Sequence, residues 1–110
     1  MNPQFKDVDR LKVFICPTRE AMGEYAAGIA VSEMKKMLLH KEELNVVFAA
    51  APSQNEFLAS LQREGGVEWN RINAFHMDEY VGLAVGQNGS FTRFLNDAVF
   101  DVLPFKNVYR

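Results

Sequence analysis

The chain has 110 residues, 48% of them hydrophobic, and a net charge of -2 at pH 7. This length and apolar content suit one domain with a buried core. Twelve basic and fourteen acidic residues without a Lys/Arg cluster argue against a nucleic-acid partner, and the single cysteine excludes an internal disulfide framework. A polar N-terminus without a signal segment, and the lack of an apolar run of membrane-spanning length, predict a cytoplasmic protein with no membrane partner.

The first predicted elements are a strand and a long helix. The β-rich run LKVFIC predicts a strand at 11–16, closed by Pro17 and Thr18. From Arg19 to about His40, apolar residues recur every three or four positions, which predicts a helix that buries one stripe. The predicted stripe consists of Met22, Tyr25, Ala26, Ile29, Ala30, Met34, Met37 and Leu38.

Two more strands and two more helices follow. The continuous apolar run at 44–51 is typical of a strand covered on both faces, and a helix is expected at 54–63. The later part of VEWNRINAFHMD predicts a third strand. Ser90 can cap a third helix that ends before Pro104, and PFKNVYR looks like the approach to a fourth strand. The apolar face of that third helix consists of Phe91, Phe94, Leu95, Ala98 and Val99.

The alternation of strands and helices indicates βαβ units in an α/β fold, an open three-layer parallel sheet. Because such a sheet is covered by helices on both faces, residues 1–110 are expected to be the N-terminal portion of a larger single domain. The fold would be truncated after its third strand-helix unit. The isolated chain would then expose an apolar face and a strand edge, so we expect it to self-associate or to be partly molten.

Ligands of open α/β sheets bind at the carboxyl ends of the strands, and two strand ends are suggestive. In the first, AAAPSQNEFL, Ser53 and Glu56 have the spacing of a capping box. Capping alone accounts for Ser53, although a helix start after a strand can also bind an anion such as phosphate. Against a phosphate, Ala50, Ala51 and Pro52 stand where close backbone approach favours glycine, and Glu56 adds negative charge.

The second strand end is FHMDEY. Strand alternation places His76 and Asp78 on one face and Met77 and Glu79 on the other, so only one of the two adjacent carboxylates can easily face a given pocket. Two solvated carboxylates are the plain alternative. Because no third ligand accompanies His76 and Asp78, we expect no metal and a hydrogen-bonded, partly buried histidine. No P-loop and no dinucleotide fingerprint is present.

The stretch NAFHMDEYVGL, followed by QNGSFTRFLNDAVFDVL, resembles the signature of the glucosamine-6-phosphate deaminase/isomerase family, which is related to the 6-phosphogluconolactonases. The resemblance extends over the whole chain. It implies a Rossmann-like fold, a small sugar phosphate as substrate, no cofactor, and a homo-oligomer for the complete protein. The implied reaction converts glucosamine 6-phosphate to fructose 6-phosphate and ammonia.

The resemblance also implies roles for individual residues. Asp78 matches the family's acid/base, which moves a proton between C2 and C1 of the ring-opened sugar. Glu79 and Tyr80 match the same motif, Glu79 as a supporting residue and Tyr80 as one that could close over the site. Ser53 and the backbone N–H of Gln54 match the family's phosphate loop.

Two departures from the family pattern leave alternatives open. The loop AAAPSQNE is poor in glycine, and neither His40 nor His76 matches the family's later motif, whose histidine assists ring opening. The family's later phosphate-binding lysine is also absent. The leading hypothesis is an incomplete part of an amino sugar phosphate isomerase/deaminase. The alternatives are a 6-phosphogluconolactonase-type hydrolase, against which EYVGL argues, and a non-catalytic phosphosugar-binding or regulatory module, against which Asp78 argues.

Overall fold

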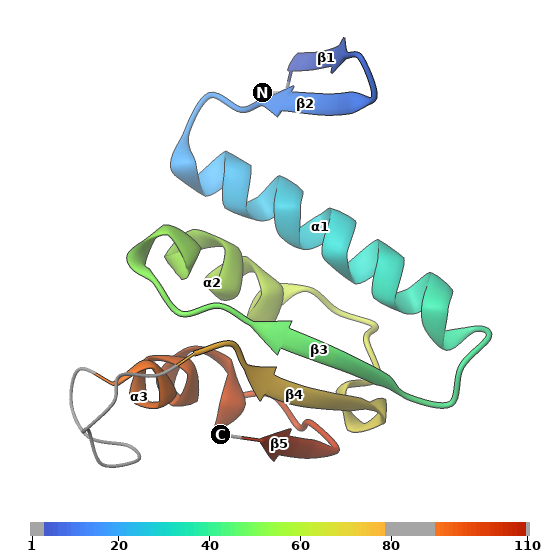
Figure 1. The fold of residues 1–110 in the computed structure, drawn as a ribbon, viewed down its shortest axis with the longest axis vertical. Coiled ribbons are helices and arrows are strands. Elements are labelled where there is room, and N and C mark those ends of the chain that lie inside the picture. The colour runs from blue at the N-terminus through green and yellow to red at the C-terminus, as the bar shows by residue number, and fades with distance from the viewer. Residues whose placement is uncertain (1–3, 79–89, 110) are drawn as a thin grey trace.

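The computed structural model describes residues 4–78 and 90–109, which form two sheets and a layer of helices (Figure 1). None of the helices in these ranges is long and apolar enough to span a membrane. In chain order, the elements are β1 (Gln4–Val8), β2 (Leu11–Ile15), α1 (Arg19–Leu38), β3 (Leu44–Phe48), the 3₁₀ turn η1 (Pro52–Gln54), α2 (Asn55–Arg63), the 3₁₀ turn η2 (Trp69–Arg71), β4 (Ile72–His76), α3 (Phe91–Leu95), the π-helical turn η3 (Asn96–Phe100) and β5 (Asn107–Tyr109).

The central sheet has the order β3-β4-β5, and both of its strand pairs are parallel. The predicted parallel α/β arrangement is therefore confirmed, as is the expected strand near the C-terminus. In the register, Leu44 pairs with Ile72 and Phe48 with His76. Helix α2 connects β3 to β4, and α3 with η3 lies between β4 and β5 in the chain. The carboxyl ends of all three strands therefore lie at one edge of the sheet.

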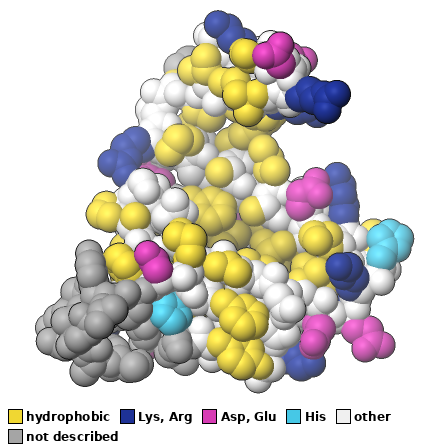
Figure 2. Space-filling view, in the orientation of Figure 1, with side chains coloured by type: hydrophobic (Ala, Val, Ile, Leu, Met, Phe, Trp, Pro, Cys, Tyr) yellow, Lys and Arg dark blue, Asp and Glu magenta, His cyan; other side chains and the backbone are white. Residues whose placement is uncertain are grey.

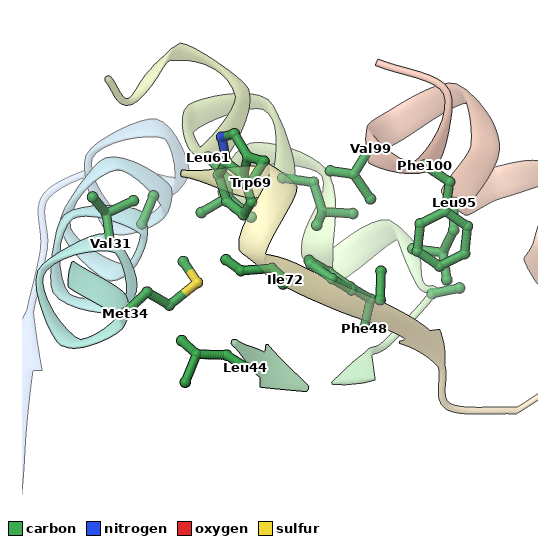
Figure 3. Close-up of a cluster of buried hydrophobic side chains, with 14 of the residues drawn as sticks. Val31, Met34, Leu44, Phe48, Leu61, Trp69, Ile72, Leu95, Val99 and Phe100 are labelled. Carbon is green, nitrogen blue, oxygen red and sulfur yellow. The ribbon is translucent and has the colours of Figure 1, made fainter. Parts of the chain in front are cut away.

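The helices pack against one face of this sheet. Leu44 and Phe48 of β3 and Ile72 and Ala74 of β4 are buried in a single cluster with helical side chains (Figure 3). Fully burying one such side chain, for example Leu61, stabilises the fold by about 1.5–3 kcal/mol. The helical members of the cluster are Ala27, Val31, Met34, Leu38, Leu58, Leu61, Leu95, Val99 and Phe100.

The opposite face of the sheet carries a ladder of asparagines. The side chain of Asn73 donates to Asn45 at 3.0 Å, and that of Asn107 donates to Asn73 at 2.9 Å. Further along the strands, the rings of Phe75 and Tyr109 stack with a centroid distance of 4.7 Å. Figure 2 shows hydrophobic side chains exposed over β4 and β5. Within residues 4–78 and 90–109, the helices bury their apolar residues in the cluster on the other face.

Strands β1 and β2 form a separate antiparallel hairpin. The prediction that the first strand begins a βαβ unit of the parallel sheet is therefore wrong. A two-residue turn joins the strands, and Asp9 in this turn has a φ of 55°, a left-handed conformation that aspartate tolerates. Phe5 contacts Phe14 with a centroid distance of 5.1 Å, and Phe14 contacts Tyr25 of α1 at 4.9 Å.

Helix α1 is confirmed, but its predicted apolar stripe is only partly correct. The helix begins after Thr18, whose Oγ1 accepts a hydrogen bond from the backbone N–H of Ala21 at 3.0 Å, the geometry of an N-cap. Met22, Ile29 and Met37 of the stripe are 47%, 44% and 45% exposed. The buried face keeps Met34 and Leu38 of the stripe and otherwise consists of Gly23, Ala27 and Val31.

Small residues on this face let α1 approach the start of α2 closely. A Cβ atom placed on Gly23 would lie 2.6 Å from the carbonyl carbon of Glu56 and 2.7 Å from its Cβ, distances that neither backbone can accommodate without a shift. A Cβ placed on Gly28 in the same helix would meet no atom within 4 Å. Periodicity predicted Met22 as a buried residue near the start of α1, whereas the close approach of the two helices places Gly23 there.

The two glycines allow a matched test of this contact. Gly23→Ala is expected to lower the free energy of unfolding by about 1–3 kcal/mol, because the added methyl group overpacks the α1–α2 contact. Gly28→Ala is expected to raise it by up to about 1 kcal/mol, because alanine has the higher helix propensity. Urea unfolding of both variants and the parent measures these changes. Equal stability of the two variants would contradict the close approach.

An ion pair joins the residues that precede β3 and β5. The Lys106 ammonium donates a hydrogen bond to the Glu43 carboxylate, and the Lys106 backbone N–H donates to the carbonyl of Ile72 at 2.9 Å. The hydrogen bond to Lys106 and its positive charge lower the pKa of Glu43 from its ordinary value of 4.5. The same contact raises the pKa of Lys106 above 10.5. Both side chains are about half exposed, so the pair contributes little to stability at neutral pH.

The pair has a defined pH dependence. Because the folded-state pKa of Glu43 lies below 4.5, its contribution is fully present above pH 4.5 and is lost as the pH falls through the lowered pKa. At alkaline pH, the contribution of Lys106 is present below 10.5 and is lost as the pH rises through the raised pKa. Glu43→Gln is expected to reduce the acid-side loss of unfolding free energy, measured by urea unfolding from about pH 7 to pH 3. Glu24→Gln is the control, and equal acid-side slopes in the two variants would contradict the assignment.

Candidate functional site

The carboxyl ends of β3 and β4 lie side by side. The register pairs Phe48 with His76, and the backbone N–H of Met77 donates to the carbonyl of Phe48 at 3.0 Å, which extends the pairing by one residue. Asp78 comes immediately after this last hydrogen bond and is exposed. The carboxylate therefore belongs to the edge of the sheet where open α/β folds bind ligands, next to the residues that follow β3.

His76 is held by the neighbouring strand. Its Nδ1 lies 3.3 Å from the carbonyl oxygen of Tyr109, and its side chain is partly buried. Because a carbonyl oxygen only accepts hydrogen bonds, this nitrogen carries the proton in that contact. The expected hydrogen-bonded, partly buried histidine is confirmed. Within residues 4–78 and 90–109, no group of three or more His, Cys, Asp or Glu side chains could hold a metal ion.

The last two residues of the M-D-E-Y motif, Glu79 and Tyr80, lie outside the described residues. No hydrogen bond or ion pair joins Asp78 to another of the described residues.

The loop after β3 differs from the predicted capping box. Ser53 is exposed within the 3₁₀ turn η1, and α2 begins after Gln54 without a side-chain cap, so the prediction that Ser53 caps the helix is wrong. Pro52 favours the start of a helical turn, which gives Ser53 a helical backbone instead of the extended one that a capping serine needs. The backbone N–H of Gln54 donates to the carbonyl of Ala51 at 2.9 Å and is engaged within the turn.

Arg19 at the start of α1 forms hydrogen bonds with this loop and with the first turn of α2. One terminal nitrogen of its guanidinium lies 3.0 Å from the Glu56 carboxylate and 3.3 Å from the carbonyl of Pro52. The negative charge of Glu56 opposes phosphate binding at this loop. The positive charge of Arg19 therefore offsets it. This contact does not follow from the local sequence, because Arg19 and Glu56 are 37 positions apart.

Removing the Arg19 contact is expected to loosen the turn that carries Ser53. In Arg19→Gln, amide hydrogen exchange at Gln54 is expected to speed up, because the hydrogen bond that closes the turn loses its anchor. Arg10→Gln, which removes the same charge from the hairpin turn, serves as the control and should leave the rate unchanged. Unchanged exchange in both variants, measured by NMR, would contradict the anchoring role.

Two cavities flank the loop. One, of about 260 Å³, lies between α1, β3 and α2, and Gln54 is the polar side chain in its otherwise apolar lining. The other, of about 320 Å³, lies between Ala50–Pro52 and the start of α3, where Ser90 and Arg93 line it. The Oγ of Ser90 accepts a hydrogen bond from the backbone N–H of Arg93 at 3.0 Å, which confirms the predicted cap of the third helix. Ser53 and Asp78 are not among the residues lining either cavity.

Sequence comparison finds relatives that share one name. No protein-family model matches the chain. The chain is 24% identical over 94 residues to a glucosamine-6-phosphate deaminase of Pseudoalteromonas translucida, covering 83% of the chain and 34% of that relative. It is 27% identical over 99 residues to one of Bacillus thuringiensis, covering 90% of the chain and 36% of the relative. The chain therefore spans about a third of the length of these curated relatives.

Solved structures of two related kinds share the fold. A monomeric glucosamine-6-phosphate deaminase of the NagB superfamily superposes with a TM-score of 0.75 at 21% identity, covering 86% of this chain and 39% of that structure. A 6-phosphogluconolactonase from Thermotoga maritima gives 0.70 at 25% identity, covering 79% and 40%. The Rossmann-like α/β fold expected from the sequence is confirmed. The chain thus resembles the glucosamine-6-phosphate deaminases in sequence, and resembles them and the 6-phosphogluconolactonases in fold.

Proposed function

We propose that this chain is part of an amino sugar phosphate isomerase/deaminase that converts glucosamine 6-phosphate to fructose 6-phosphate and ammonia. The observation that carries the proposal is the place of Asp78, an unpartnered carboxylate among the described residues, directly after the last β3–β4 hydrogen bond. Sequence relatives named glucosamine-6-phosphate deaminase support the same reaction.

The proposed role of Asp78 is proton transfer at two adjacent carbons. Its carboxylate removes the proton from C2 of the open-chain sugar. The C–H electron pair forms the C1–C2 double bond, while the π pair of the C1 carbonyl moves to O1, which takes a proton. Asp78 then returns its proton to C1 as the nitrogen lone pair forms a C2=N bond. Water adds to C2 and ammonia leaves, which gives the ketose. A carboxylate anchored at the end of a buried strand suits this task, because general-base catalysis requires the base to be held within hydrogen-bond reach of the carbon acid.

The residues around Asp78 have supporting roles in this proposal. Glu79 supports the motif and Tyr80 closes over the sugar. The exposed hydroxyl of Ser53 can donate to a phosphate oxygen, whereas the backbone N–H of Gln54 is already engaged with Ala51. Gln54 would therefore contribute its side-chain amide, or its backbone N–H after a local rearrangement of the turn.

The chain by itself is proposed to supply one wall of the site. The curated relatives are about three times as long, and the described residues leave one face of the sheet without helices. A longer form is proposed to bring the histidine that assists ring opening and a further phosphate ligand. Such a form is also proposed to assemble as a homo-oligomer and to work in the cytoplasm.

A second candidate is sugar-lactone hydrolysis. It is favoured by the fold, which the Thermotoga maritima 6-phosphogluconolactonase shares with a TM-score of 0.70 at 25% identity. Hydrolysis of a lactone needs an activated water and no C2 proton exchange, so the two reactions are distinguished by their products and by solvent isotope incorporation. A non-catalytic phosphosugar-binding module would bind the sugar phosphate and catalyse neither reaction.

The role of Asp78 is tested by isotope exchange in a longer form of the protein. Asp78→Asn is expected to slow the exchange of the C2 proton with deuterated solvent by about 10²- to 10⁴-fold, the usual contribution of a general base. Binding of glucosamine 6-phosphate should be largely retained. Asp7→Asn in the hairpin is the control for the loss of one carboxylate, and exchange at the parental rate in Asp78→Asn would refute the assigned role.

A further inference from the structure

Arg71 contacts three backbone carbonyls at the end of the sheet opposite the candidate site. Its Nε donates to the carbonyl of Glu42 at 2.8 Å, and one terminal nitrogen donates to those of Leu38 and Lys41 at 3.0 and 2.5 Å. We propose that Arg71 is a positioning residue for the reaction. It fixes the register of β4 against β3 and thereby determines how far Asp78 extends beyond the end of β3.

The three carbonyls belong to the connection that enters β3. Leu38 is the last residue of α1, and a cation is favourable at a helix C-terminus, where the final carbonyls have no partner within the helix. Glu42 lies two residues before Leu44, the first residue of β3. Arg71 directly precedes Ile72, the first residue of β4. One side chain therefore joins the starts of two adjacent parallel strands (Figure 1).

The buried core alone leaves part of this register open. A shift of β4 by one residue would turn Ile72 and Ala74 away from the helices, so the hydrophobic cluster excludes it. A shift by two residues keeps the same set of side chains on the helix face. Such a shift would move Asp78 by about 6.6 Å along the strand, because each residue of a parallel strand rises by about 3.3 Å.

Two contacts oppose the shift by two residues. The hydrogen bond from Asn73 to Asn45 on the other face of the sheet joins neutral groups. The contacts of Arg71 are charge-assisted and therefore stronger. Its guanidinium presents the donors in a rigid planar fork, and a displacement of about 6.6 Å would take them out of hydrogen-bond reach of the three carbonyls. Lysine carries its three donors on one nitrogen and cannot reproduce this fork.

The inference rests on the proposed function only where it connects the register to proton transfer. A general base must lie within hydrogen-bond reach of the carbon acid, and a misplacement of about 1 Å can lower a rate by about 10²-fold. The register itself belongs to the described strands, so it can be measured without a substrate.

Amide hydrogen exchange in the 110-residue chain, followed by NMR, tests the register. Arg71→Lys keeps the positive charge but loses the fork. The Met77 amide donates to Phe48 at the end of the strand pairing, and a shifted or frayed pairing removes this acceptor. Its exchange is expected to become at least about tenfold faster relative to that of the Leu61 amide in α2. The ratio separates register from overall stability, because global unfolding exposes both amides.

Two control variants complete this test. Arg63→Lys changes an arginine that donates to the side chain of Ser60 in its own helix, and it should leave the ratio unchanged. Glu68→Gln removes the ion-pair partner of Arg71 but none of its carbonyl contacts, and it should also leave the ratio unchanged. The proposal is overturned if either control raises the ratio as much as Arg71→Lys. It is also overturned if Arg71→Lys leaves the ratio at its parental value or removes the protection of both amides together.

A longer form that catalyses the proposed reaction allows a second measurement. Arg71→Lys is expected to lower kcat by up to about 10²-fold with little change in KM, because the base moves while the loop that carries Ser53 stays in place. An unchanged kcat would overturn the positioning role. A longer form that releases no ammonia would refute the proposed function instead, and the exchange ratio would still decide whether Arg71 fixes the register.

Discussion

The parallel pairing of β3 with β4 is the constraint on which the candidate site depends. The register ends with Phe48 opposite His76, and the hydrogen bond from Met77 to Phe48 carries it one residue further. A shift of one residue would turn every side chain of β4 to the other face of the sheet, including the buried Ile72 and Ala74. The core on the helix side therefore determines where Asp78 stands relative to the loop after β3.

Helix α1 contacts the loop after β3 and the start of α2. Gly23 lets α1 touch the backbone of α2 at Glu56, and Arg19, one turn earlier in α1, contacts Glu56 and the carbonyl of Pro52. The two contacts reinforce each other, since the close approach brings the arginine within reach and the ion pair offsets the negative charge beside the loop. The opposite face of the sheet is polar at this position. Its asparagine side chains form hydrogen bonds with one another, and none of the described helices covers them.

Much of the fold could be predicted from the sequence, because its local patterns and its tertiary structure agree. The apolar run of β3, the periodicity of α1 and the serine before α3 each correspond to an observed element. The hairpin could not be predicted, because QFKDV has no strong strand pattern. The residues of β2 also do not show which strand it pairs with. Ser53 was misassigned as a cap because Pro52 starts the turn one position earlier. The contact of Arg19 with the loop after β3 was missed, because only the tertiary fold brings these residues together.

The account rests on the claim that the strand end at Asp78 is one wall of an amino sugar phosphate isomerase site. The most direct test is an assay of ammonia and fructose 6-phosphate released from glucosamine 6-phosphate, run on the 110-residue chain and on a form extended beyond Arg110. The account predicts both products, in equal amounts, from the extended form and none from the shorter chain. An extended form that binds the substrate but releases neither product would contradict it.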